Sequence, residues 1–443
     1  MKPLRRTPLD AWMRGKMGLG DEALTLEHVE RYQLARLREL LDHARHRSPH
    51  YRRAFQSLAQ VASLADLERL PFTTDRDLRG NAQDFLCVSQ GEVSRVVTLA
   101  SSGTTGQPKR LCFTAEEQDS TVDFFHQCLA TLIDKGDRAF ILLPGGVPGS
   151  AGDLIATALR RLGGEPIPHG FVRDLPQAVG VMRHEGATSV VGSPVHALAL
   201  ARYAERVGGE PLRFKAAFLI ADHVPGCIVR ELENSWRCEV CEHYGMTEMG
   251  LGGGIDCQAH EGYHLREADL YFEIVDPLTG HCLPPGERGE VVFTTLTRRG
   301  MPLIRYRTGD LSRLLVERCR CGSALRRLER IRGRTTDTSV TGAPGGTGVT
   351  MPALDEALFA IPGLVDFAAE ARSRSTPAVL AITAWSFVPD CPAVVRSVFE
   401  ALERVPAVSS ARASGALELT VTAAVVGEHL PRGPEKRVIS EVK

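Results

Sequence analysis

Long hydrophobic runs are missing from this sequence of 443 residues. A stretch of about 18 apolar residues, the length that crosses a bilayer, occurs nowhere. The basic start MKPLRRTPLDAWMRGK is not followed by the apolar segment of a signal peptide. Internal repeats and low-complexity tracts are missing as well. We therefore expect a globular, cytoplasmic protein without a membrane partner.

Net charge is also nearly absent. The sequence has 53 Lys and Arg against 54 Asp and Glu, a net charge of -1, so no overall field attracts nucleic acid. The eleven Cys are an odd number scattered over the whole chain, which excludes the dense disulfide framework of a small secreted fold. We expect free thiols, except for one cluster of cysteines that is a candidate metal site.

The composition is globular, and the length allows more than one domain. Apolar residues make up 43% and charged residues 24% of a chain roughly three times the common domain size. An amphipathic helix is expected from Leu34 until Ser48 and Pro49 end it. Short apolar runs at 139–143, 189–191 and 217–220 alternate with helical patterns, which predicts a layered α/β core with a largely parallel sheet.

A second, smaller region is expected toward the C-terminus. The Gly- and Thr-rich segment TGAPGGTGVT at 341–350 indicates a domain boundary. We predict a large layered α/β domain at 1–335, with a β-rich subdomain at about 255–335 that includes a strand at 290–295. A small α+β domain is predicted at 336–443, with elements near 354–359, 379–385, 394–402 and 417–426.

The string SSGTTGQPK at residues 101–109 is the first segment of the chain whose residue types indicate a binding site. Glycine allows a tight turn that exposes N–H groups, hydroxyls donate to phosphate oxygens, and lysine adds positive charge. The string lacks the spacing of a P-loop, and a plain polar loop remains the alternative reading. The candidate phosphate-binding residues are Ser101, Ser102, Gly103, Thr104, Thr105, Gly106 and Lys109.

Three more segments follow in chain order: HYGMTE at 243–248, YRTGD at 306–310 and RGR at 332–334. Together with the loop they resemble the motifs of the adenylate-forming superfamily, which includes acyl-CoA synthetases. The QLARLRELL helix, the LPFTT segment, and the TTLT and MPLIRYRTGD runs resemble the phenylacetate-CoA ligase group more closely.

The resemblance implies an AMP-forming carboxylic acid–CoA ligase that uses ATP, Mg²⁺ and coenzyme A, with a small aryl or arylacetic acid as the expected substrate. It implies that Glu248 holds Mg²⁺, a hard cation that prefers oxygen ligands, and that Thr247 contacts the α-phosphate. Tyr244 would pack against adenine, Asp310 would accept hydrogen bonds from the ribose, and Arg334 would donate to the nucleotide.

The C-terminal domain would be mobile and would supply the adenylation lysine, for which Lys436 is the candidate. Its context, Glu-Lys-Arg-Val, departs from the Gly-Lys-x-x-Arg-Val of the group, and Thr336 stands where the hinge usually has Asp. Three alternatives stay open: an adenylating enzyme with an amine, carrier or deazaflavin acceptor, a non-catalytic nucleotide-binding scaffold, and a solvated role for Lys436. A homodimer is left open as the assembly.

The cysteine cluster suggests a structural Zn²⁺ site. Cys319 and Cys321 flank one residue, and Cys257 is followed by His260 and His264. Cys and His ligands in fours suit tetrahedral Zn²⁺. The Cys-x-Cys spacing leaves unligated thiols as the alternative, and the resemblance to the phenylacetate-CoA ligase group favours His264 as the fourth ligand.

Overall fold

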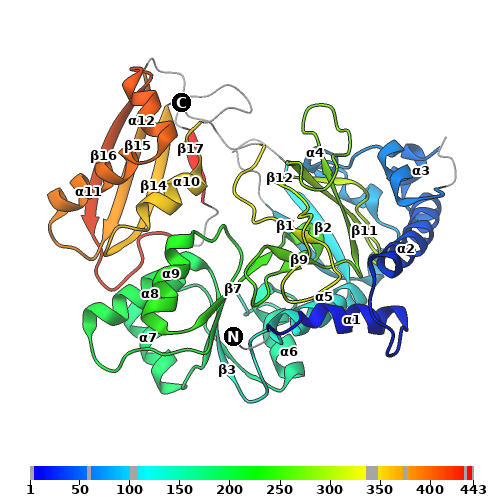
Figure 1. Ribbon diagram of the computed structural model, residues 1–443, viewed down its shortest axis with the longest axis horizontal. Coiled ribbons are helices and arrows are strands. Elements are labelled where there is room, and N and C mark those ends of the chain that lie inside the picture. Colours follow the sequence, from blue (N-terminus) through cyan, green and yellow to red (C-terminus); the bar gives the residue numbers. More distant parts are fainter. Residues whose placement is uncertain are drawn as a thin grey trace. The chain divides into compact units, whose positions relative to one another are not determined.

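The computed structural model describes residues 4–56, 61–99, 107–335, 348–372, 377–433 and 437–441. The chain divides into two compact units, each assembled from segments that are far apart in the sequence (Figure 1). Unit 1 comprises Met1–Thr131, Asp153–Leu162 and His243–Ile331, and unit 2 comprises Leu132–Gly152, Gly163–Glu242 and Arg332–Lys443.

The N-terminal helices of unit 1 confirm the first amphipathic pattern. Helix α2 (Leu26–Arg47) buries Leu37, Leu41 and Ala44 on one face. The next residue, Ser48, ends α2 in an extended conformation and caps the following helix with its hydroxyl. The other α-helices here are α1 (Pro8–Met17), α3 (Pro49–Ala54), α4 (Asp75–Leu78), α5 (Ala115–Leu129) and α6 (Ala151–Leu162).

Unit 1 contains the antiparallel β structure that the sequence predicts. Strands β10 (Leu270–Val275), β11 (Gly289–Thr295) and β12 (Tyr306–Ser312) form an antiparallel sheet in that order. Every residue of β11 is buried, so the strand is covered on both faces. The remaining antiparallel strands are β1 (Val93–Leu99), β2 (Lys109–Thr114), β8 (Gly254–Ile255), β9 (Tyr263–Leu265) and β13 (Arg327–Leu328).

Unit 2 contains the parallel sheet. Its strands follow the order β4-β3-β5-β6-β7, and every neighbouring pair is parallel. The central strands are buried along their whole length, which explains why they are continuous apolar runs. The elements are β3 (Arg138–Leu142), β4 (Glu165–Pro168), β5 (Ser189–Gly192), β6 (Ala216–Leu219), β7 (Glu239–Tyr244, whose last two residues belong to unit 1), α7 (Leu175–His184), α8 (Pro194–Val207) and α9 (Gly226–Trp236).

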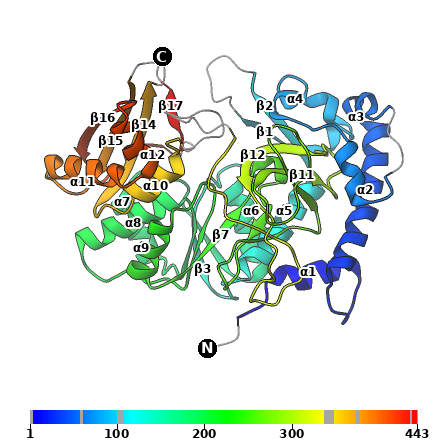
Figure 2. The same cartoon turned by 45° about the horizontal axis from the view of Figure 1, so that its top comes forward.

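The C-terminal part of unit 2 is a four-stranded sheet in the order β16-β15-β14-β17. Helices α10, α11 and α12 lie against one face of this sheet (Figures 1 and 2). Arg202 of α8 connects this C-terminal part to the rest of unit 2, because its guanidinium donates to the carbonyl oxygen of Phe359 at 2.8 Å. The elements are α10 (Met351–Leu358), β14 (Leu364–Arg372), β15 (Ala378–Ser386), α11 (Cys391–Glu403), α12 (Pro406–Ala413), β16 (Leu417–Val425) and β17 (Ile439–Glu441).

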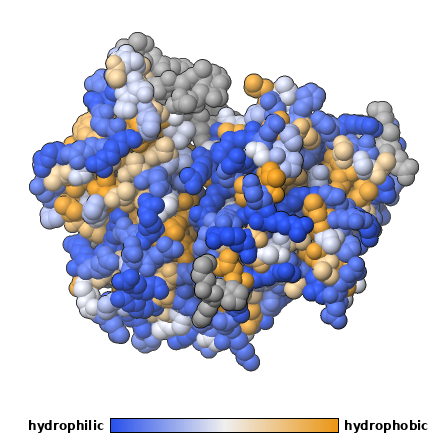
Figure 3. All heavy atoms as spheres, viewed as in Figure 1, coloured by the Kyte–Doolittle hydropathy of each residue, from blue (hydrophilic) through white to orange (hydrophobic). Residues whose placement is uncertain are grey.

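The predicted fold class, a large layered α/β part followed by a small α+β part, is confirmed. One change of unit falls between Ile331 and Arg332, but the boundary at residue 335 stays a prediction. Hydrophilic residues cover most of the face in Figure 3, with hydrophobic residues between them. Within the described ranges, no helix combines the length and apolar character needed to cross a membrane.

Candidate functional site

Lys109 lies at the centre of a buried charge cluster in unit 1. Its side-chain ammonium forms ion pairs with the carboxylates of Glu248 and Asp75, the second at 2.5 Å. The hydroxyl of Tyr306 lies 3.3 Å from the ammonium and donates to Glu248 at 3.2 Å. Lys109 and Glu248 are only 7% and 3% exposed. Three of the four sequence motifs, represented by Lys109, Glu248 and Tyr306, therefore meet in one buried cluster.

Local turns place these side chains. Asp75 is the first residue of α4, behind a capping box made by Thr74. Glu248 lies in the single turn Thr247–Met249 that follows β7. This turn needs Gly245, because a Cβ atom there would lie 2.0 Å from the carbonyl oxygen of Leu251.

The electrostatics of the cluster favour an ionised Asp75 carboxylate. Burial raises the pKa of Asp75, but the hydrogen bonds and charges of Lys109 and Arg79 outweigh burial and hold that pKa below its usual range. Two carboxylates and a phenol around one ammonium offer a set of hard oxygen donors, and such donors suit Mg²⁺. The residues present therefore fit a magnesium ion next to Glu248.

The ribose and adenine candidates also lie together. The hydroxyl of Tyr244 donates to the carboxylate of Asp310 at 3.0 Å, and both side chains are buried. The ring of Tyr244 stacks on Tyr263, with the ring centres 5.9 Å apart. Thr247 follows three residues after Tyr244, in the turn that carries Glu248. The nucleotide contacts assigned to these residues stay predictions.

Several predicted residues lie elsewhere. The loop residues 101–106, Lys436 and Thr336 fall outside the described residues. Arg334 belongs to unit 2, whereas Lys109 and the other described nucleotide candidates belong to unit 1. Their roles also stay predictions.

The cysteine cluster comes together as four buried side chains. The ligand atoms of Cys257, His264, Cys319 and Cys321 all lie within 4.8 Å of one another. The sulfur atoms of Cys257 and Cys319 are 3.5 Å apart, and Nε2 of His264 is 3.4 Å from the sulfur of Cys321. His260 instead contacts Asp256 at 2.8 Å through Nδ1. The geometry thus selects His264 for the cluster.

Charge explains why this cluster fits a divalent metal. Hydrogen bonds with neighbouring thiols raise the pKa of Cys257 and lower that of Cys321. Burial lowers the pKa of His264, but hydrogen bonds with the Cys319 and Cys321 sulfurs outweigh it and raise that pKa to about 9. Thiols this close compete for ionisation, because a second thiolate repels the first. A dication removes the repulsion, and a Cys₃His donor set is one that Zn²⁺ takes.

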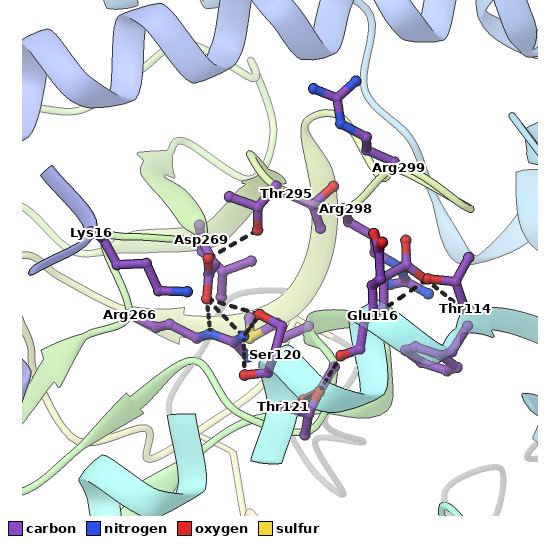
Figure 4. Close-up of a pocket in the computed structure, with 16 residues that line it drawn as sticks. Lys16, Thr114, Glu116, Ser120, Thr121, Arg266, Asp269, Thr295, Arg298 and Arg299 are labelled. Atoms are coloured by element: carbon purple, nitrogen blue, oxygen red, sulfur yellow. Dashed lines mark hydrogen bonds and ion pairs between the residues drawn. The ribbon is translucent and has the colours of Figure 1, made fainter. Parts of the chain in front are cut away.

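A cavity of about 210 Å³ lies in unit 1 beside the Glu248 turn (Figure 4). Met249 and Gly250 form part of its wall, and charged side chains line much of the rest. Two ion pairs join these side chains to each other: Arg266 with Asp269 at 2.7 Å and Arg298 with Glu117 at 3.9 Å. The lining residues are Lys16, Phe113, Thr114, Glu116, Glu117, Ser120, Thr121, Met249, Gly250, Arg266, Asp269, Leu270, Thr295, Thr297, Arg298 and Arg299.

Two residues of the site were missed from the sequence. Asp75 follows the LPFTT segment directly, and its place after a capping threonine was the available signal. Arg298 donates to the main-chain carbonyl of Glu248 at 2.9 Å. No spacing rule connects these two positions, which are 50 residues apart.

Comparison with known proteins gives a family match. A family model described as AMP-binding enzyme matches residues 52–296. The chain is 32% identical to the phenylacetate-coenzyme A ligase of Aromatoleum evansii over 340 residues, which cover 71% of this chain and 72% of that relative. It is 31% identical to the ligase of the same name from Thermus thermophilus over 364 residues, 78% of each chain.

Solved structures show the same fold. A 2-hydroxyisobutyryl-CoA ligase in complex with 2-HIB-AMP, in its postadenylation state, is similar with a TM-score of 0.79 and 21% identity over 95% of this chain and 91% of that one. An anthranilate CoA ligase in complex with anthranoyl-AMP is similar with a TM-score of 0.53 and 15% identity, over 77% of this chain and 65% of that one.

Proposed function

Because the chain belongs to the AMP-binding enzyme family, we propose that it is an AMP-forming carboxylic acid–CoA ligase. The observation that carries this proposal is the Lys109–Glu248 pair, which joins the end of the phosphate-loop motif to the aromatic-Gly-x-Thr-Glu motif inside one buried cluster. The relatives named phenylacetate-coenzyme A ligase make aryl and arylacetic acids the first substrates to test.

The reaction has two steps. A carboxylate oxygen of the acid attacks the α-phosphorus of ATP, the bond to pyrophosphate breaks, and an acyl-adenylate forms. The thiol of coenzyme A then loses its proton and attacks the acyl carbon, and the bond to AMP breaks to leave the thioester. Each step needs the reacting groups held in line and the developing negative charge neutralised.

The buried cluster suits the first step. Glu248 would hold Mg²⁺, which neutralises phosphate charge when bound. Lys109 carries its positive charge at the end of the phosphate loop and is held by ion pairs with Asp75 and Glu248, so it would act on phosphate oxygens with little reorganisation. Thr247, in the same turn as Glu248, would donate to the α-phosphate.

The other site residues would bind the rest of the nucleotide. We assign the ribose to Asp310 and the adenine to Tyr244, which already fixes the Asp310 carboxylate by a hydrogen bond. Arg334 would donate to the nucleotide, and Lys436 would reach the acid carboxylate and the α-phosphate. The loop residues before Lys109 would supply hydroxyl and N–H donors to the phosphates.

Zn²⁺ is proposed as a structural ion in unit 1. Its ligands would be the four side chains of the cysteine cluster, and the site is closed because all four are buried. A closed four-ligand site leaves no position for a substrate, so the ion would stabilise the β-rich part and take no part in the reaction.

The test of the function is ATP–pyrophosphate exchange with a panel of aryl, arylacetic and short aliphatic acids, followed by mass analysis of products with coenzyme A. We expect exchange with at least one acid and formation of its CoA thioester. Glu248→Gln, which keeps the size but loses the charge, should abolish exchange. A folded protein without exchange for any acid would refute the proposal. If the protein shows exchange but transfers the activated group only to an amine, a carrier or a deazaflavin, the proposed acceptor would change from coenzyme A to that molecule.

A further inference from the structure

The turn that carries Glu248 has empty space beside it. Met249 and Gly250 border the cavity of about 210 Å³, while the Met249 side chain itself is buried in the hydrophobic core of unit 1. Within the turn itself, two main-chain hydrogen bonds of 3.0 Å join Met249 to Met246 and Gly250 to Thr247. On the side that borders the cavity, directed hydrogen bonds from other elements add to this packing in fixing the position of the turn.

Arg298 supplies such bonds. Its guanidinium donates to the carbonyl oxygen of Glu248 at 2.9 Å and to the carbonyl oxygen of Cys112 at 3.0 Å. It also lies over the ring of Phe113, with its central carbon 4.3 Å from the ring centre. Cys112 belongs to β2, the strand that begins at Lys109. One side chain therefore ties the main chain of Glu248 to the strand that carries its partner Lys109.

Arg298 is itself held in place by Glu117 of α5. One carboxylate oxygen of Glu117 accepts from the main-chain N–H of Gly300 at 2.6 Å, and the other accepts from that of Thr114 at 2.9 Å. The second oxygen lies 3.9 Å from Nε of Arg298. The residue after Arg298, Arg299, is exposed and forms an ion pair with Glu39 at 3.8 Å.

Stability alone does not explain a guanidinium here. Arg298 is 7% exposed, and burial lowers its pKa although acidic neighbours, first Glu117, act to raise it. Its Nε makes no hydrogen bond with the described residues. Apolar residues of similar volume often match or exceed the stability of a buried charged group. What an apolar side chain cannot do is bridge two carbonyl oxygens at fixed distances.

We propose that Arg298 is a positioning residue for acyl-adenylate formation, which holds the Glu248 carboxylate at a fixed distance from Lys109. This inference rests on the proposed function. It assigns Arg298 to the first half-reaction alone, because Glu248 would hold the metal of ATP and takes no part in transfer to coenzyme A.

The test compares Arg298→Met, Arg298→Lys and the matched control Arg299→Met, a change of the neighbouring exposed arginine. Three quantities are measured for each: ATP–pyrophosphate exchange at varied Mg²⁺, thioester formation from supplied acyl-adenylate, and the urea midpoint of unfolding. We expect Arg298→Met to lower exchange roughly 10- to 100-fold, the usual effect of losing a residue that orients a metal ligand, and to require more Mg²⁺. Thioester formation should stay within about twofold of wild type.

The conservative variant separates position from charge. Lysine keeps the charge but cannot reproduce the planar two-donor geometry, so Arg298→Lys should fall between wild type and Arg298→Met. Thr121→Val, which removes the hydrogen bond of 3.1 Å from the Thr121 hydroxyl to the carbonyl of Gly250, should lower exchange in the same direction. It keeps the inference testable if Arg298→Met does not fold.

Two results would overturn the inference while wild-type exchange remains normal: unchanged exchange in Arg298→Met, or equal losses in both half-reactions that follow the unfolding midpoint. If Arg298→Met fails to fold, unchanged exchange in both Arg298→Lys and Thr121→Val overturns it. A wild-type protein without any exchange refutes the proposed function, and this inference with it.

Discussion

A buried carboxylate in the C-terminal part of unit 2 should make stability fall as pH rises. Arg437 donates to Asp355 at 2.8 Å and to Asp366 at 2.5 Å, and its guanidinium lies over the rings of Phe359 and Phe367. One guanidinium thus faces two buried carboxyl groups. Burial raises the pKa of Asp355 from 3.8 to about 7, even though Arg437 acts to lower it.

The sign and size follow from proton linkage. Between about pH 4 and pH 7, Asp355 holds its proton in the folded state and has lost it in the unfolded state, so the free energy of unfolding falls as pH rises through this window. Over the two pH units from pH 5 to pH 7, the free energy of unfolding should fall by about 3 kcal/mol. This value is an upper bound, because Arg437 is a charged partner that favours the ionised form of Asp355.

The perturbation is Asp355→Asn, which stays neutral at every pH and keeps an oxygen acceptor for Arg437. Near pH 5 the variant and the wild type should have similar stability. At pH 8 the variant should be more stable by up to about 3 kcal/mol. Asp390→Asn is the matched control, since Asp390 is an exposed N-cap of α11 and Asn caps equally well.

The assay is urea unfolding at pH 5, 6, 7 and 8, followed by tryptophan fluorescence in a Trp12→Phe background. The remaining tryptophans, Trp236 and Trp385, both lie in unit 2 and report on it alone. Parallel pH curves for wild type and Asp355→Asn would refute the reasoning, because Arg437 would then keep Asp355 ionised across the whole range.

The other predictions concern the two sites of unit 1 and the C-terminal lysine. Lys109→Met should lower stability by about 3 to 5 kcal/mol, because it leaves the buried Glu248 carboxylate as an uncompensated charge, whereas Asp75 keeps its ion pair with Arg79. Lys109→Arg should restore part of that stability; equal urea midpoints for wild type and Lys109→Met would contradict this. Removal of Zn²⁺ by a chelator should lower the melting temperature together with the zinc content found by elemental analysis, whereas a metal-free protein with an unchanged melting temperature would not fit a structural ion. Lys436→Ala should lose exchange and keep thioester formation from acyl-adenylate, and equal loss of both would argue for a different role.

Local patterns were sufficient to predict most elements. The runs 139–143, 189–191 and 217–220 became β3, β5 and β6, because a strand buried on both faces must be apolar throughout. The C-terminal patterns likewise matched α10, β15, α11 and β16. In each case the side chains that form the pattern lie close together in the sequence.

Contacts between distant segments could not be predicted in the same way. Residues 332–443 share a compact unit with 132–152 and 163–242, a grouping of segments far apart in the chain that no local pattern indicates. Arg298 and Asp75 reach the site because tertiary structure brings their segments to Glu248 and Lys109. The cysteine cluster was predictable as a set, but only its geometry chose between the two histidines.

The arrangement of unit 2 also sets the order in which it can fold during translation. The side chain of Arg202 in helix α8 donates a hydrogen bond to the carbonyl oxygen of Phe359, which lies 157 residues further along the chain. At a synthesis rate of about 5 to 20 residues per second, the ribosome needs roughly 10 to 30 s to make the intervening chain. During that time the apolar face of α8 has no native partner from the C-terminal sheet, so nascent chains stalled before residue 359 should bind holdase chaperones more strongly than full-length chains.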